Sequence, residues 1–347
     1  VAPSLGGSHP LLRGPSSKNP GHMAATTLTL PVPAHVLDDR LDSRHASEEV
    51  LQAWARQEQS AFSASRLAEG EPVSDPLRHT VLRLVASLNS ISVPEEHLKG
   101  WLLRIAQVID MSTILVDEVP LERMFSRVAA VWMLTLKFEA GGGSMDLLTP
   151  AVIDLMVESA TRCSSACGGA AVTLHDIQCE ELALCRTYLP GVCMPSVVDW
   201  LATMFLRFGV ATDRADEGCF DKMHARGTSW AMNLLWVWPT SKQHPPQSTA
   251  IGIFGAVLIN AGFVLRETVF RADDAGAGQL AGPSGAALWN RPLEPWSSSA
   301  LRSSPEEVAF AMEFASQEEV VSAMEFATLC EFDTILARVI AVAQWLA

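Results

Sequence analysis

Apolar residues recur with a helical period along most of this chain. From residue 75 onward, every strongly patterned segment places its apolar side chains three or four positions apart, which is the spacing of one face of an α-helix. No segment shows the strict alternation of a half-buried strand. The pattern therefore predicts an all-α protein, with helices over residues 78–88, 94–110, 120–140, 150–162, 173–189, 196–207, 220–238 and 249–265, and more helix in the last 40 residues.

Two of these segments are apolar around almost their whole circumference. Residues 128–136 contain only Thr135 as a polar side chain, and residues 249–265 are nearly as apolar. A helix without a polar face belongs at the centre of a bundle, so we expect each segment to be surrounded by other helices. Residues 249–265 also approach the length of a membrane span, but the presence of Asn260 and the short length favour a buried helix in a soluble bundle.

Turn and cap residues divide the chain into four parts. Residues 1–46 are rich in Pro, Gly, Ser and His and predict a disordered tail. Residues 47–74 predict an N-terminal amphipathic helix, with Leu51, Trp54 and Phe62 on its apolar face, followed by a linker. Because the helical pattern starts again after Pro195, we expect a five-helix unit over 75–194 and a second, divergent unit over 195–347. The Gly-, Ser-, Pro- and Ala-rich residues 272–304 predict a loop insertion in the second unit.

Charge and cysteine usage limit the classes of partner. The formal net charge is −14, and an acidic surface repels phosphates and anionic lipid, so we expect no nucleic acid and no membrane as partner. The seven cysteines are odd in number, which favours free thiols in an intracellular reducing compartment, nuclear or cytoplasmic. Cys163 and Cys167 form the one close pair, and no second pair completes a zinc site. We therefore expect no metal and no other cofactor.

Several short segments resemble the cyclin box, a five-helix unit, over residues 75–265. The first, Leu77-Arg78-His79-Thr80-Val81-Leu82, resembles the opening of the box, and Val108-Ile109-Asp110 resembles the end of its second helix. Lys137 and Glu181 stand at the places of a third-helix lysine and a fifth-helix glutamate. Pro195-Ser196 is similar to the start of a second repeat. Charged residues of the right kind in the right helices, in order, make the resemblance more specific than any one segment.

The cyclin resemblance implies a fold and a function. The fold would be two five-helix repeats, the second divergent, and the protein would be a non-enzymatic regulatory subunit. It would bind a cyclin-dependent protein kinase as a heterodimer and activate it, without a small-molecule ligand. In the family, the positions of Lys137 and Glu181 grip the backbone of the kinase's regulatory helix, and the positions of Cys185 and Val192 supply apolar contacts.

The resemblance also implies a possible substrate-docking groove at Leu77, Val81 and Leu84. Family members place a large tryptophan where Leu84 stands. All three residues also fit ordinary core positions of the first helix, and that interpretation is the one we favour.

Two charged pairs have interpretations that do not depend on the resemblance. Arg78 and Asp110 lie within apolar helices, where an unpaired charge costs several kcal/mol, so we expect them to form a buried ion pair; the alternative is that both are solvated. Lys137 and Glu181 either present a donor and an acceptor to a partner's backbone or bridge each other within the molecule.

Enzyme motifs are weak in this chain. Gly141-Gly142-Gly143 ends a predicted helix, whereas a phosphate-binding loop precedes one. His175 and Cys179 are one helical turn apart, a spacing that more often arises by coincidence than as a catalytic pair. Two non-catalytic alternatives remain: a transcription-factor-IIB-like protein, which the negative charge disfavours, and a helical scaffold or adaptor without affinity for a kinase.

Overall fold

The computed structural model describes residues 41, 46–64, 75–92, 98–111, 121–139, 148–192, 194–214, 218–237, 245–264, 311 and 316–346. Within these ranges the chain forms eleven helices and no strand. The all-α fold predicted from the hydrophobic period is therefore confirmed. The predicted loop insertion at 272–304 lies outside the described residues, and so does the predicted tail apart from Leu41 and Ala46, both of which are buried.

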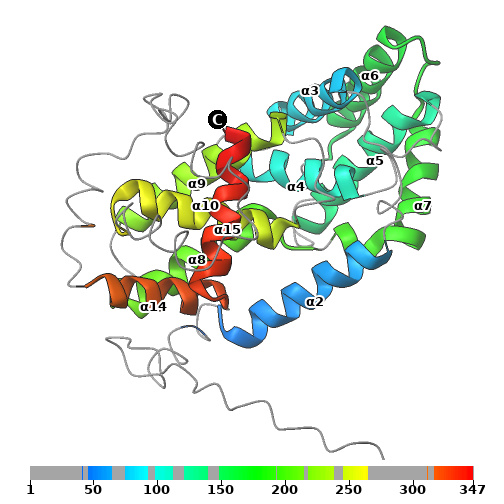
Figure 1. Ribbon diagram of the computed structural model, residues 1–347. Helices are drawn as coiled ribbons and strands as arrows, with labels where there is room; N and C mark the ends of the chain where they lie inside the picture. Colours follow the sequence, from blue (N-terminus) through cyan, green and yellow to red (C-terminus); the bar gives the residue numbers. More distant parts are fainter. Residues whose placement is uncertain are drawn as a thin grey trace, which may run out of the picture.

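Five helices form the first half of the bundle, with α5 at their centre (Figure 1). Their bounds are α3 Asp75–Ser92, α4 Leu98–Met111, α5 Leu121–Glu139, α6 Pro150–Ala166 and α7 Leu174–Val192. α5 touches each of the other four, and every residue from 128 to 136 is buried. The central position predicted for this apolar segment is confirmed.

The second half is built around α10. Its described helices are α8 Val197–Ala211, α9 Cys219–Val237, α10 Pro246–Ala261, α14 Gln317–Thr328 and α15 Phe332–Leu346. α10 packs against α8, α9 and α15, which explains why it is apolar on all sides. No helix in the described ranges combines the length and the apolar character that crossing a membrane requires.

Two glycines let α10 and α15 approach closely. A Cβ atom built on Gly252 would lie 2.6 Å from the Arg338 carbonyl oxygen, and one built on Gly255 would lie 2.6 Å from a methyl group of Val339. Contacts this short require one helix to move, and at Gly252 the obstacle is backbone. Gly252 is therefore a spacing residue of the α10–α15 contact.

Gly252→Ala is expected to lower the free energy of unfolding by about 1 to 3 kcal/mol, because overpacking outweighs the roughly 1 kcal/mol that alanine gains over glycine in a helix. Gly227→Ala in α9 is the matched control. Its Cβ would meet only side-chain atoms at 3.4 Å or more, so this change should be neutral or stabilising. Urea unfolding of both variants checks the prediction, and equal effects would contradict it.

Local capping follows the sequence at the starts of α6 and α8. Thr149 accepts a hydrogen bond from the Val152 backbone N–H at 3.3 Å, and Ser196 forms a full capping box with Asp199. Several predicted ends were wrong: α3 and α8 continue to Ser92 and Ala211, four residues beyond the predicted ends, and α6 and α7 also run on. α6 continues through the small residues after 162 to Ala166, with Cys167 as C-cap and Gly168, which has a φ of +80°, immediately after it. α7 continues two residues beyond Pro190, because a proline in the last turn disrupts few remaining bonds of the helix.

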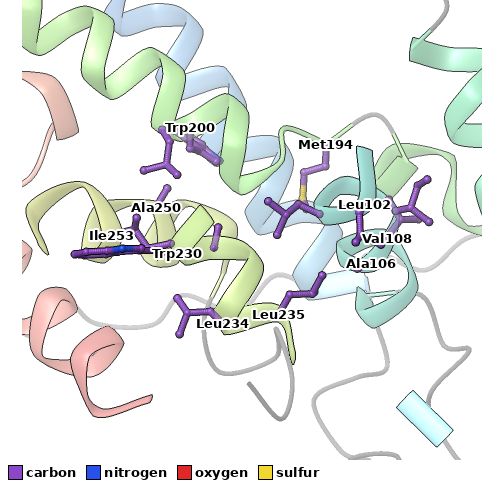
Figure 2. Packing of buried hydrophobic residues seen from close by; sticks show 14 of the residues in the cluster. Leu102, Ala106, Val108, Met194, Trp200, Trp230, Leu234, Leu235, Ala250 and Ile253 are labelled. Carbon is purple, nitrogen blue, oxygen red and sulfur yellow. The ribbon is translucent and has the colours of Figure 1, made fainter. Parts of the chain in front are cut away.

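Helix α2 (Glu48–Ala64) runs along one edge of the molecule and touches both halves (Figure 1). It contacts α7, and its side chains reach α8 and α10. One continuous apolar cluster extends from Leu51 in α2 to Val342 in α15. Figure 2 shows its middle section, where Leu102 of α4 lies near Met194; α4 also contacts α9, which carries Trp230, Leu234 and Leu235.

Candidate functional site

The last turn of α5 meets α7 at a charged pair on the surface. Lys137 Nζ donates a hydrogen bond to Glu181 Oε1. The Lys137 side chain is 35% exposed and the Glu181 side chain 17% exposed. A lysine is favoured in the last turn of a helix, where the carbonyl dipoles attract a cation. The structure thus brings together the two residues singled out by the sequence, and places them within reach of solvent.

A second carboxylate, beside this pair in the sequence, fixes α7 against α5. Glu180 is buried and accepts a hydrogen bond at 2.7 Å from Arg123 Nε and one at 2.6 Å from Arg127 Nε, each on a different carboxylate oxygen. The neighbouring carboxylates of α7 therefore bind opposite ends of α5: Glu180 the first half of the helix and Glu181 its last turn. The sequence analysis missed this cluster, although two arginines four positions apart on an apolar helix were a usable signal.

Apolar side chains flank the Lys137–Glu181 pair. Phe138 and Leu182, the next residues of α5 and α7, are 44% and 52% exposed. Cys185, one turn beyond Glu181, is half-buried and packs against the core. Exposed aromatic and aliphatic groups beside a few charges are common where one protein binds another. We call Lys137, Phe138, Glu181, Leu182 and Cys185 the α5/α7 face.

The other predicted site residues are placed only in part. Val192 belongs to α7, but its side chain lies outside the described part of the structure, as do those of Leu77, Arg78 and Asp110. Val81 and Leu84 are buried in the main core, which agrees with the core interpretation of these positions and leaves neither side chain on the surface.

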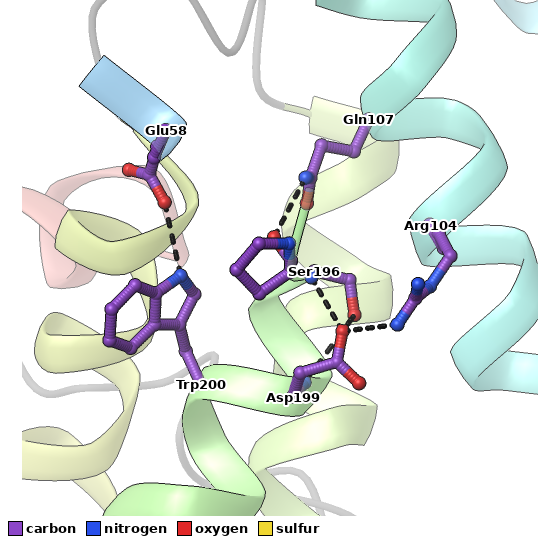
Figure 3. Close-up of polar contacts among 7 residues, drawn as sticks. Glu58, Arg104, Gln107, Ser196, Asp199 and Trp200 are labelled. Atoms are coloured by element: carbon purple, nitrogen blue, oxygen red, sulfur yellow. Dashed lines mark hydrogen bonds and ion pairs between the residues drawn. The ribbon is translucent and has the colours of Figure 1, made fainter. Parts of the chain in front are cut away.

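A polar junction joins α4 to the start of α8 (Figure 3). Arg104 donates to the Asp199 carboxylate, which also accepts from the Ser196 backbone N–H at 2.6 Å. Gln107 Nε2 donates to the Pro195 carbonyl oxygen at 3.1 Å. The restart of the helical pattern at Pro195 is thus held by two side chains of α4, neither of which the sequence analysis identified.

Glu58 in α2 is a further residue that the sequence analysis missed. It is 3% exposed and accepts a hydrogen bond at 3.0 Å from the Trp200 indole N–H (Figure 3). The signal was its position, seven residues after Leu51 and four after Trp54, on the stripe that the helical period assigns to the core. A carboxylate on such a stripe needs a buried partner.

Other reactive groups among the described residues are scattered. His175 Nε2 and Cys179 Sγ are 3.6 Å apart on exposed turns of α7. Burial raises the pKa of the Cys163 and Cys330 thiols, which keeps them protonated and poorly nucleophilic near neutral pH. No group of three potential metal ligands occurs within the described ranges. The α5/α7 face therefore offers binding chemistry: a cation, an anion and apolar contacts.

Comparison with known proteins adds no assignment. No protein-family model matches the chain, and no curated protein or solved structure does so.

Proposed function

We propose that this protein is a cyclin-like regulatory subunit that binds and activates a cyclin-dependent protein kinase through the α5/α7 face. The observation that carries the proposal is the solvent-accessible Lys137–Glu181 pair, with exposed Phe138 and Leu182 beside it. Cyclins use such a pair, on their third and fifth helices, to grip the kinase's regulatory helix.

The arrangement of helices supports the same proposal. In the first half, α3 touches α4, α5 and α6, while α5 also touches α4 and α7; in the second half, α8 touches α9, α10 and α14, while α10 also touches α9 and α15. Counted from the start of each half, these pairs correspond, whereas the α5–α6 contact of the first half and the α14–α15 contact of the second have no strong counterpart. We therefore propose two cyclin-like units, the second interrupted by the chain between α10 and α14.

The proposed binding step exchanges one set of polar contacts for another. Lys137 and Glu181 would separate, the ammonium donating to backbone carbonyls of the partner helix and the carboxylate accepting from backbone N–H groups. Exposed ion pairs are worth only about 0 to 1 kcal/mol, so opening this half-exposed pair costs little. Holding the kinase's regulatory helix inward then aligns the kinase's own Lys–Glu pair, and the kinase performs phosphoryl transfer.

A helical scaffold without kinase affinity is the second candidate. It is favoured by the ion pair itself, because Lys137 and Glu181 already satisfy each other within the chain. Under this alternative the pair contributes to the contact of α5 with α7 and has no further role.

A charge swap separates the two candidates. Lys137→Glu/Glu181→Lys keeps an internal ion pair but reverses the polarity presented to a partner, so the fold should survive while kinase binding is lost. We expect affinity capture from host extract to recover a cyclin-dependent kinase with the wild type, and less than a tenth as much with the swap.

The matched control is Glu158→Arg/Arg162→Glu, which swaps an exposed pair on α6. It should capture as much kinase as the wild type. A kinase recovered equally with both swaps would place the binding surface elsewhere, and no kinase with any of the three proteins would favour the scaffold.

A further inference from the structure

Helix α2 is attached to the second half of the bundle at an acidic residue. Leu51 is buried and Trp54 half-buried, and Glu58 occupies the next position of the same stripe. Trp54 packs edge-on against Trp200 of α8 with 5.3 Å between ring centroids. The stripe thus docks on α8 through one aromatic ring and one carboxyl group.

Glu58 also caps the first turn of α10. Both of its carboxyl oxygens lie 3.2 Å from the Gln247 backbone nitrogen, which donates to them. α10 begins at Pro245-Pro246 and receives no hydrogen bond from a cap side chain of its own. A carboxyl group 189 residues away in the sequence therefore supplies the contact that a local Ser, Thr, Asp or Asn usually makes.

Burial and hydrogen bonding oppose each other at this carboxyl group. Desolvation raises the pKa of Glu58 to about 7, and the N–H donors of Gln247 and Trp200 offset only part of that effect. Among the described residues of α2, α8 and α10, no charged or titratable side chain contributes to the shift. Docking of α2 therefore favours the protonated form of Glu58, and protonation of Glu58 in turn favours docking.

We propose that Glu58 is a proton-controlled latch, which holds α2 against α8 and α10 when it is protonated and weakens that attachment when it ionises. The neutral acid tolerates the buried position between Trp200 and α10, whereas the carboxylate gains by moving into water. Because α2 also contacts α7, its release would uncover part of α7 as well. The proposal does not depend on the identity of any binding partner.

The direction of the pH effect follows from the raised pKa. An acid whose docked pKa lies above its undocked value contributes stability that is fully present below about 4.5 and is lost as the pH rises through about 7. With these two values, the docking equilibrium of α2 should weaken about tenfold between pH 6 and pH 8.

Hydrogen–deuterium exchange of the full chain tests the latch. Protection factors of the α2 amides, corrected for intrinsic exchange, should fall about tenfold from pH 6 to pH 8, while those of α5 stay constant. Glu58→Gln should abolish this dependence. Glu49→Gln, which neutralises an exposed glutamate of the same helix, should behave as the wild type.

Two further measurements keep the test decisive if Glu58→Gln fails to fold. Gln247→Pro removes the N–H that favours the carboxylate, while proline is accepted in a first helical turn, so the transition should move to higher pH. The wild-type profile alone also decides: α2 protection that does not change between pH 6 and pH 8 would overturn the proposal. So would a Glu58→Gln protein that keeps the wild-type dependence.

Discussion

Arg207→Ala is expected to lower the free energy of unfolding by about 3 to 5 kcal/mol. The guanidinium is 1% exposed and donates at 2.8 Å to the Ala46 carbonyl oxygen and at 2.8 and 3.3 Å to that of Phe326. It also lies over the Phe326 ring, 4.4 Å from the centroid. Truncation would remove charge-assisted hydrogen bonds, deprive two carbonyls of a donor and leave a cavity, and all three effects destabilise.

Urea unfolding monitored by circular dichroism measures this loss. Arg207→Met, which refills most of the space without donating, separates the cavity from the hydrogen bonds and should recover only part of the stability. Arg83→Ala on the exposed face of α3 is the control and should change stability by less than about 0.5 kcal/mol. If Arg207→Ala were as mild as this control, the contacts of Arg207 with Ala46 and Phe326 would not stabilise the fold.

Glu180→Ala is expected to cost about 2 to 4 kcal/mol. Removing one partner of a buried ion pair leaves an uncompensated charge, and here Arg127 is only 14% exposed. Arg123, which is 57% exposed, can turn to solvent and contributes less. The loss should appear both in urea unfolding and as faster exchange of α7 amides, because Glu180 ties α7 to α5.

The control for Glu180→Ala is Glu158→Ala. Glu158 pairs with Arg162 at 2.7 Å, but both side chains are more than 60% exposed, so its removal should cost no more than about 0.5 kcal/mol. A similar cost at Glu158 and Glu180 would contradict the argument that burial sets the value of these ion pairs.

Much of the fold was predictable because it is encoded locally. The apolar run around Trp132 predicted a central helix, and Thr149 and Ser196 predicted helix starts, since a cap acts within three residues of itself. Where a helix ends was harder. At the end of α6 the left-handed conformation of Gly168 decided the boundary, and the small residues before it did not.

Of the α5/α7 face, only Lys137, Glu181 and Cys185, which match positions of a known family, were predictable. Lys137 and Glu181 were found by comparison of motifs, while Glu180 was overlooked although it lies beside Glu181 and is the more deeply buried. Glu58 and Arg207 were missed for another reason. Their partners lie more than 100 residues away, and a helical period shows that a side chain faces inward without showing what it meets.

The cap that α2 provides for α10 has a consequence during synthesis of the chain. Glu58 is translated 189 residues before Gln247, a delay of roughly 10 to 40 s at ordinary rates of elongation. For most of this interval Trp54 also lacks its partner Trp200, which is translated 146 residues after it. The nascent chain therefore exposes the apolar stripe of the amphipathic helix α2 until α8 and α10 have left the ribosome, and the stripe is a surface to which a chaperone would bind.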